Sequence, residues 1–436
     1  MGRDSDFCFN YDVAEMSQRK KLIVIGGGAS GFFCAVNAAR LNPGLEVVII
    51  EKSNKLLSKV KVSGGGRCNL THYSEEVADM IDAYPRGKNF MKKALYSFSS
   101  NDTEKWFSDR GVLLKSESDG RMFPVSDKSQ TIIDCLMKEA EKLGVEICLQ
   151  IEVLDIKKNE VGFEIVMNDG GALQHIIHAD FICIATGGHP KDAGFNWLRK
   201  IGLDIEPPVP SLFTFNIPDK NLHQLMGVAN PKTGVKISQL KIQEQGPVLI
   251  THWGLSGPAI LRMSARAAKE LHQMNYEFEV KLNWAPNFHE SAMLEEIKIK
   301  RVQLSKQYIG NKNPFDISSR LWNYILEKSR IRPEESWANI STESSNLLSK
   351  NICGDAYQVK GKTTFKEEFV TAGGVKLESI NQATLESKKI PGLYFVGEVL
   401  NVDGITGGYN FQHAWASGWI AANAITDSLN TQSSIS

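Results

Sequence analysis

The chain has 436 residues, of which 42% are hydrophobic and 23% charged, and its 50 Lys and Arg residues balance 50 Asp and Glu residues. This composition is typical of a folded protein with two or three domains. The net charge of zero argues against a nucleic-acid partner. No apolar run approaches the ~18 residues of a membrane span. Seven scattered cysteines without a C-x-x-C pair argue against a metal site and a dithiol redox centre, and we expect a cytoplasmic protein.

The first predicted elements form a strand–helix–strand unit. A polar stretch of mixed charge, residues 1–20, precedes it, and we expect this stretch to be a flexible N-terminal extension. The short apolar run 22–25 is typical of a buried parallel strand. Apolar residues recur at helical spacing over 29–41, and the apolar run 47–50 predicts a second strand.

Three glycines join the first strand to the helix with the spacing G-x-G-x-x-G. Gly26 permits a tight turn, Gly28 lets the backbone approach a pyrophosphate, and Gly31 lets the helix pack closely on the strand. Glu51 follows the second strand, where it can accept hydrogen bonds from the two hydroxyls of a ribose. The whole unit predicts a dinucleotide site rather than an ordinary strand-to-helix turn, without deciding between FAD and NAD.

A second glycine-rich stretch follows over residues 52–71, which we predict to be a polar connection. Its three consecutive glycines suggest backbone lying close to a flat or anionic group, and Arg67 could supply a positive charge there. A flexible surface loop is the alternative. Residues 75–145 are predicted to be mainly helical, with a hairpin over 111–125 and an amphipathic helix over 131–143.

Strands return after this helical region. We predict one apolar strand, three short antiparallel strands and a further buried strand, over residues 145–149, 151–156, 162–167, 173–179 and 181–188. The last strand ends in a Thr-Gly-Gly turn at 186–188, which is a second close approach of backbone at a strand's carboxyl end. Its place in the chain suits a strand that returns to the first sheet.

The pattern changes at Pro207, where three prolines within four residues mark a boundary. Segments with strand character follow over 212–217, 235–242, 248–251 and 276–284. The last of them alternates cleanly between apolar and polar residues, which suits an antiparallel sheet or barrel. Residues 289–350 have a helical pattern and predict a small helical insert, and a strand is expected over 366–374.

The end of the chain decides the cofactor. A buried strand over 392–398 is followed by Asp403 in a loop, and then by a Gly407-Gly408 pair that opens a helix over 414–425. The first N–H groups of that helix can bind an anion or a carbonyl oxygen. An NAD domain does not need a second half so far along the chain, whereas the flavin end of FAD does. We therefore expect FAD.

Motifs across residues 21–425 resemble the HI0933-like (YhiN/BaiN-like) family of bacterial FAD-dependent oxidoreductases, which are two-dinucleotide-binding-domain flavoproteins. In family order they are VIGGGASG at 24–31, SGGGRCN at 63–69, FPVSD at 123–127, ATGG at 185–188, THWGLSGP at 251–258, TAGGV at 371–375, and Gly397-Glu398 with GGYN at 407–410.

The resemblance implies an α/β fold in which a Rossmann-like FAD-binding domain is interrupted by a β-barrel-like domain with a small helical subdomain. We place the FAD-binding domain at 21–207 and 366–430. The β-barrel-like insert on the substrate side then covers 208–288 and 351–365, and the helical subdomain covers 289–350.

The resemblance also implies noncovalent FAD. Glu51 would bind the adenosine ribose, the Val153 backbone the adenine, and Asp403 the ribityl–pyrophosphate region, while the turn from Gly407 to Asn410 would approach the flavin ring. The predicted cofactor-binding residues are Gly26, Gly28, Ala29, Ser30, Gly31, Glu51, Lys52, Gly65, Gly66, Arg67, Cys68, Asn69, Val153, Ala185, Thr186, Gly187, Gly188, Gly397, Glu398, Asp403, Gly407, Gly408, Tyr409 and Asn410.

The predicted function is FAD-dependent oxidation or reduction of a small organic substrate. Members of the resembled family have been assigned enone reduction on bile-acid-type compounds and amine oxidation. The chain has no second G-x-G-x-x-G unit, so NADH or NADPH would act as a transient donor at the flavin, or the substrate itself would reduce it.

Three residues are candidate acid–base groups, Arg67, His252 and Tyr409, although His252 is more simply read as structural, and we assign no catalytic residue. Two alternatives belong to other classes of protein. One is an FAD-dependent RNA-modifying enzyme, against which the neutral charge argues, and the other is a regulatory flavoprotein. The oligomeric state stays open.

Overall fold

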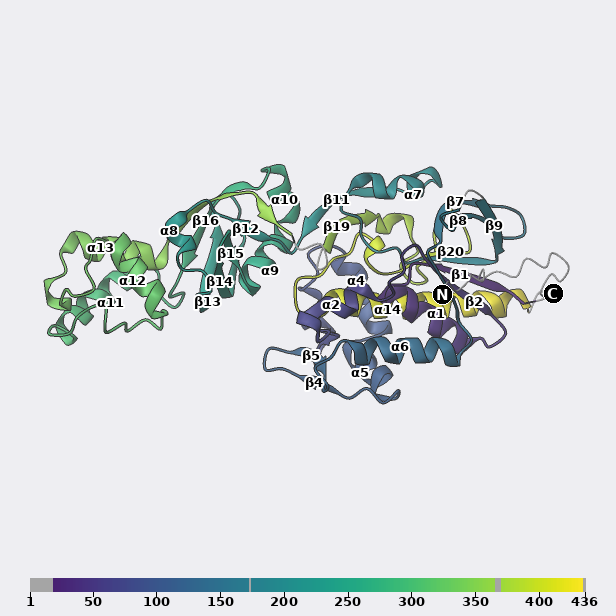
Figure 1. Cartoon of the computed structure of the whole chain (residues 1–436), viewed down its shortest axis with the longest axis horizontal. Helices are drawn as coiled ribbons and strands as arrows, with labels where there is room; N and C mark the ends of the chain where they lie inside the picture. The colour runs from purple at the N-terminus through teal and green to yellow at the C-terminus, as the bar shows by residue number, and fades with distance from the viewer. Residues whose placement is uncertain (1–18, 172–173, 365–369, 434–436) are drawn as a thin grey trace, which may run out of the picture. The chain divides into compact units, whose positions relative to one another are not determined.

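The computed structural model describes residues 19–171, 174–364 and 370–433. The predicted N-terminal extension lies outside the described residues except for its last two positions. The chain divides into two compact units, Met1–Pro210 with Lys366–Ser436, and Ser211–Phe365 (Figure 1). Among the described residues, no helix is both long and apolar enough to cross a membrane.

The first unit is built on a five-stranded parallel sheet. Its order is β20 (Leu393–Phe395), β10 (Phe181–Ile184), β1 (Lys21–Ile25), β2 (Glu46–Glu51) and β6 (Glu146–Leu149). Val24 on the central strand lies opposite Ile49 on one side and Cys183 on the other. The predicted return of the strand at 181–188 to the first sheet is therefore confirmed, although the strand itself ends at Ile184, as is the α/β fold with a parallel sheet.

Two helices from opposite ends of the chain pack together in this unit. They are α1 (Ala29–Leu41) and α14 (Tyr409–Ser433), and they lie side by side (Figure 1). A Cβ on Gly418 of α14 would lie 2.9 Å from the Ser30 carbonyl oxygen, so glycine allows this close contact. The structure confirms the predicted bounds of α1, whereas α14 begins five residues before the predicted start at 414.

Shorter elements surround the parallel sheet. The helices are α2 (Ser58–Gly66), α3 (Val77–Ile81), α4 (Lys88–Ser97), α5 (Ser100–Ser108), α6 (Gln130–Lys142) and α7 (Asn196–Lys200). Two small antiparallel sheets contain β3 (Thr71–His72), β5 (Arg121–Pro124) and β4 (Leu114–Ser116), and β7 (Glu152–Lys158), β8 (Phe163–Asn168) and β9 (Gln174–Ala179). The predicted hairpin, amphipathic helix and antiparallel strands are thus confirmed.

One sequence prediction in this unit was wrong in detail, and one strand was missed. The polar connection over 52–71 contains α2, whose helical start was hidden because its last residues, 63–65, leave helical geometry at the glycine run. The prolines from Pro207 lie inside a strand, β11 (Ile205–Ser211), which pairs only with β19 (Val370–Val375) among the described residues. A two-stranded ribbon tolerates proline because one side of each strand needs no partner. The first residues of the predicted strand 366–374 lie outside the described part.

The second unit is built on a seven-stranded antiparallel sheet. Its order is β17 (Asp355–Lys360), β16 (Glu277–Asn283), β13 (Ala229–Ile237), β14 (Gln243–Thr251), β15 (Gly254–Ser256), β12 (Thr214–Asn216) and β18 (Lys362–Thr363). Residues 238–242 form the turn between β13 and β14, so the strand predicted over 235–242 was placed too far along the chain. Leu240 and Ile242 in this turn pack against the core, which explains the misleading apolar alternation.

The helices of the second unit share one hydrophobic core with its sheet. They are α8 (Lys220–His223), α9 (Pro258–Arg266), α10 (Ala268–Gln273), α11 (Glu290–Gln303), α12 (Ser319–Lys328) and α13 (Thr342–Cys353). Val280 of the sheet, Ile260 of α9 and Ile325 of α12 belong to the same buried cluster. The finer division into a β-barrel-like insert and a helical subdomain stays a prediction.

A buried carboxylate ties this sheet to α12. Asp355 is only 2% exposed, and its oxygens accept hydrogen bonds from Trp284 Nε1 at 3.0 Å and from the Tyr357 hydroxyl at 2.6 Å. Lys328 forms an ion pair with the same carboxylate. Burial raises the pKa of Tyr357, and the negative charge of Asp355 raises it further. The Tyr357 hydroxyl therefore stays protonated and donates its hydrogen bond to Asp355.

We expect Asp355→Ala to lower the free energy of unfolding by about 3 kcal/mol, because an ammonium, an indole N–H and a phenol all lose their acceptor. Urea titration followed by tryptophan fluorescence measures this change. Glu327→Ala, which removes an exposed carboxylate from α12, should change stability by less than about 0.5 kcal/mol. Equal decreases in the free energy of unfolding of the two variants would show that the buried cluster around Asp355 makes no specific contribution to stability.

Candidate functional site

The N-terminus of α1 lies at the carboxyl end of β1 and is formed by glycines with different tasks. Gly26 has a φ of +118°, and a Cβ there would lie 2.3 Å from the Ala185 carbonyl oxygen. A Cβ on Gly31 would lie 2.1 Å from the Gly26 carbonyl oxygen, whereas a Cβ on Gly28 would meet nothing within 4 Å. The outer glycines therefore serve packing. Gly28 borders open space immediately before α1, which has 13 residues. The first backbone N–H groups of this helix, from Ala29 and Ser30 onward, and the helix dipole favour the binding of a phosphate there.

Glu51 ends β2 beside this turn. Its Oε2 accepts a hydrogen bond from the Gly27 N–H at 2.9 Å, and its Oε1 accepts one from the Ser53 N–H at 2.8 Å. Each carboxylate oxygen keeps a lone pair that could accept from a ribose hydroxyl. The neighbouring Lys52 forms an exposed ion pair with Glu152, and Val153 follows on β7.

The glycine run at the end of α2 is held in left-handed geometry. Gly64, Gly65 and Gly66 have φ values of +58°, +69° and +86°, and neither Gly65 nor Gly66 has an atom within 4 Å of the place a Cβ would take. Arg67 turns to the β4–β5 hairpin, where it pairs with Glu117 at 2.8 Å and lies 4.0 Å from the centre of the Phe123 ring. Its hydrogen bond with Glu117 raises the pKa of Arg67, so this residue is a fixed cation and not an acid–base group.

Cys68 and Asn69, two predicted cofactor-binding residues, follow Arg67 and make their contacts within the protein. Cys68 is fully buried at a φ of +63°, and burial raises the pKa of its thiol to about 12, so it is not a thiolate nucleophile. The Asn69 amide, in the orientation that satisfies both its ends, accepts from the Gly408 N–H and donates to the Thr71 carbonyl, each at 3.1 Å. This bond brings together two predicted segments that are more than 300 residues apart.

The turn before α14 is fixed by its neighbours. Gly407 and Gly408 have φ values of +134° and +94°, and a Cβ on Gly408 would lie 2.5 Å from the Thr71 carbonyl oxygen. His72 Nδ1 lies 3.2 Å from the Gly407 carbonyl oxygen, and the His72 ring stacks on Tyr409 with their centres 4.7 Å apart.

Further contacts hold the start of α14 itself. The Tyr84 hydroxyl donates to the Tyr409 carbonyl at 2.9 Å. The Asn410 amide exchanges two hydrogen bonds with the Gly404 backbone at 2.8 and 2.9 Å. The predicted flavin-side turn is therefore a preformed structure. His72 was missed from the sequence, although its place three residues after the SGGGRCN motif was a usable signal.

Asp403 is fully buried, and both its carboxylate oxygens accept from the Arg86 guanidinium. Arg86 could not be predicted from the sequence, because it stands alone in a loop far from Asp403 in the chain. The ion pair cancels the negative charge of Asp403, so the region presents no net repulsion to a pyrophosphate.

Buried polar atoms without a partner lie on three of the segments that follow or adjoin the parallel strands β10 and β20. The buried Oγ1 atoms of Thr186 and Thr371 and the Oδ1 of Asn401 have no hydrogen-bond partner among the described residues. Glu398 Oε1 accepts from the Thr371 N–H at 2.8 Å, and Glu398 also pairs with Lys59. Leaving buried hydroxyls unpaired costs free energy, so these atoms point to a polar ligand.

Glycines border the same region. A Cβ on Gly188 would lie 2.3 Å from Thr371 Oγ1, and one on Gly397 would lie 2.3 Å from Ser30 Oγ, while a Cβ on Gly187 would meet nothing within 4 Å. The open N-terminus of α1, the open glycines and the unpaired hydroxyls together fit a dinucleotide such as FAD.

Among the predicted acid–base candidates, His252 lies in the second unit, where its ring meets Trp253 edge-on.

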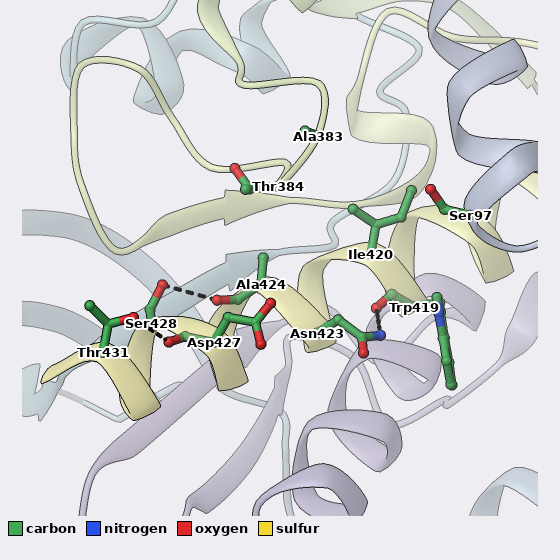
Figure 2. A pocket seen from close by; sticks show the side chains of 10 residues that line it. All are labelled: Ser97, Ala383, Thr384, Trp419, Ile420, Asn423, Ala424, Asp427, Ser428 and Thr431. Carbon is green, nitrogen blue, oxygen red and sulfur yellow. Dashed lines mark hydrogen bonds between the residues drawn. The ribbon is translucent and has the colours of Figure 1, made fainter. Parts of the chain in front are cut away.

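A separate pocket lies along the later turns of α14. Figure 2 shows its lining side chains, among which Trp419 and Ile420 are apolar and Asp427 is charged. Its volume is about 590 Å³, and none of the predicted cofactor residues lines it. This pocket is therefore distinct from the candidate cofactor site.

Comparison with known families identifies the fold and the chemistry. The family model described as HI0933-like protein Rossmann domain matches residues 20–424. The chain belongs to the HI0933-like family. This HI0933-like protein is therefore an FAD-dependent oxidoreductase with a Rossmann-like FAD-binding fold, as predicted.

Two curated relatives cover nearly the whole chain. The ribosomal RNA dihydrouridine synthase of Escherichia coli K12 is 31% identical over 93% of this chain and 98% of its own length. The 3-dehydro-bile acid delta(4,6)-reductase of Clostridium scindens is 28% identical over 93% of this chain and 98% of its own length.

A solved structure shares the fold. The 3-ketosteroid delta1-dehydrogenase of Sterolibacterium denitrificans superposes with a TM-score of 0.52 at 13% identity, covering 94% of this chain and 100% of that one. At this identity the likeness shows the fold alone.

The two kinds of motif glycine should respond differently to alanine. We expect Gly28→Ala to leave the melting temperature of the FAD-free protein unchanged and to weaken FAD binding at least about tenfold, because the methyl group would occupy the space at the helix N-terminus. Gly31→Ala should lower the melting temperature of the FAD-free protein, since its Cβ would meet backbone. Calorimetry and quenching of flavin fluorescence measure the two effects. Unchanged FAD affinity in Gly28→Ala would contradict the assignment.

A buried histidine on α14 should make stability depend on pH. His413 is 2% exposed, its Nε2 is buried without a partner among the described residues, and burial lowers the pKa of its imidazole to about 3. Between pH 6.5 and 3 the unfolded chain binds a proton here that the folded protein does not, so acidification favours unfolding.

We expect the free energy of unfolding to fall more steeply for the wild-type than for His413→Gln as the pH is lowered from 6 to 4. The two slopes should differ by up to about 1.4 kcal/mol per pH unit. Urea titrations at each pH measure it. Parallel losses in the two proteins would show that His413 is protonated in the folded state.

Proposed function

We propose that this protein reduces a carbon–carbon double bond conjugated with a carbonyl group, and that its substrate is uridine in ribosomal RNA. NADH or NADPH would donate the electrons. The proposal rests on two relatives named ribosomal RNA dihydrouridine synthase, from Escherichia coli and Haemophilus influenzae, which are 31% and 30% identical over at least 93% of this chain.

The chemistry of the relatives' names supports one type of reaction. Dihydrouridine is uridine whose C5=C6 bond has gained two hydrogens, and that bond is conjugated with the C4 carbonyl. In a steroid ring oxidised at C3, double bonds at positions 4 and 6 are likewise conjugated with a carbonyl. One hydride and one proton saturate such a bond, and oxidation of NAD(P)H to NAD(P)⁺ balances the two electrons.

Bound FAD would carry the hydride from the nicotinamide to the substrate. The chain's own residues would bind and orient the FAD. The backbone N–H groups that follow Gly28 would contact the pyrophosphate, Glu51 the adenosine ribose, and the turn from Gly407 to Asn410 the flavin ring. The Asp403–Arg86 pair would adjoin the ribityl–pyrophosphate region. With its pKa of about 12, the Cys68 thiol would keep its proton at neutral pH.

A steroid-type dienone is the second candidate substrate, supported by the relative at 28% identity. A cytoplasmic location remains our proposal, and the seven scattered cysteines without a C-x-x-C pair support it.

An anaerobic titration tests the proposal. We expect NADH or NADPH to bleach the flavin spectrum of the purified holoenzyme, and uridine-containing ribosomal RNA to restore it while dihydrouridine appears in nuclease digests analysed by mass spectrometry. A matched transcript with cytidine in place of uridine, which has no carbonyl at C4, serves as the chemical control and should not restore the flavin spectrum.

The outcomes separate the two substrates. Restoration by a 3-oxo-4,6-diene steroid, with no dihydrouridine formed, would overturn the RNA assignment and keep the reaction type. A flavin that neither nicotinamide reduces, but that an amine does, would overturn both.

A further inference from the structure

The neutral charge of the whole chain hides an uneven distribution. Residues 211–365 hold 20 Lys and Arg residues against 14 Asp and Glu residues, whereas the rest of the chain holds 30 against 36. The second unit is thus positive by six charges and the remainder negative by six. An excess of positive charge confined to one unit is typical of proteins that contact nucleic acid through that unit.

Within the second unit the positive charge is densest in one segment, residues 298–312, which we call the basic segment. It carries five Lys and Arg residues and no Asp or Glu. It comprises the second half of α11 and the turn that follows (Figure 1). Glu295 and Glu296, just before it, pair with Lys298 and Lys300. Its remaining cations are Arg301, which donates to the Ala338 carbonyl, and the exposed Lys306 and Lys312.

Large apolar and aromatic side chains are exposed among these cations. Ile299 is 47% exposed, Val302 78% and Tyr308 55%. Ile299 and Val302 lie on α11 and Tyr308 in the turn after it, and a surface that meets only water would carry polar residues at these positions, because exposing apolar groups to water is unfavourable. The mixture of cations with exposed apolar and aromatic groups instead suits a partner that offers both phosphates and bases.

The backbone around Tyr308 is firmly held. The Gln307 carbonyl accepts from the Trp337 N–H at 3.0 Å, and the Ile309 carbonyl accepts from Trp322 Nε1 at 2.8 Å. The Ile309 side chain is fully buried, so Tyr308 beside it points outward. An aromatic ring presented on a rigid backbone can stack on a base without a further entropy cost of ordering the loop.

We propose that the basic segment binds RNA, with Lys306 and Lys312 contacting phosphates and Tyr308 stacking on an unpaired base. This inference rests on the proposed function and names the surface that holds its RNA substrate. Acidic residues also lie close by, since the backbone of Glu335 bonds with that of Ile309 and Glu334 precedes it. The phosphate contacts are therefore assigned to the two lysines that flank Tyr308 in sequence.

The test measures binding of the FAD-loaded full-length protein to a fluorescent ribosomal RNA fragment that contains unpaired uridines, by anisotropy at several salt concentrations. Tyr308→Ala should weaken binding about tenfold at every salt concentration, because stacking is nearly independent of salt. Lys306→Gln with Lys312→Gln should weaken binding and reduce the slope of log affinity against log salt by about 2, one for each lost phosphate contact.

Lys138→Gln is the matched control, since Lys138 is an exposed lysine on α6 of the first unit, and its affinity should equal that of wild-type. All variants should keep wild-type FAD content and the wild-type rate of flavin reduction by NAD(P)H. Unchanged affinity in Tyr308→Ala, or loss instead in Tyr96→Ala on α4, where the tyrosine is 73% exposed, would overturn the proposal. Wild-type protein that binds no RNA but reduces a steroid dienone would overturn the proposed substrate instead.

Discussion

The first unit depends on one close contact between backbones. The carbonyl of Ala185, at the end of β10, lies where a Cβ of Gly26 would be, and Gly31 of α1 packs against the carbonyl of Gly26 in turn. Because no side chain separates these segments, the start of α1 comes directly to the carboxyl ends of the central strands. The helix dipole, Glu51 and the unpaired threonine hydroxyls thereby face one region, which no single segment could form alone.

Elements whose pattern is local were predictable from the sequence. The helix from Ala29 to Leu41 and the buried strands were found because apolar periodicity and glycine punctuation agree there. The start of α2 was missed because the glycine run dominated the pattern. The strand β11 was missed because its prolines, which usually break strands, lie in a two-stranded ribbon.

Features that depend on distant contacts could not be predicted from one sequence. Nothing near Arg86 indicates that it binds Asp403, and nothing near Asn69 indicates that its amide reaches Gly408, because these partners meet only when both ends of the chain assemble. The total charge misled for a related reason. It sums two units with opposite excess, and the uneven distribution becomes visible only when the charges on either side of the boundary near Pro210 are counted separately.

The packing of α14 on α1 also fixes an order of events during synthesis. The ribosome delivers residues 211–365 before β20 and the 25-residue α14 exist, so the second unit, continuous in sequence, has its whole core available first. The first unit then still lacks an edge strand of its parallel sheet and the helix that covers α1. The apolar surfaces that β20 and α14 cover in the folded unit therefore stay exposed until the last segment of the chain has been made.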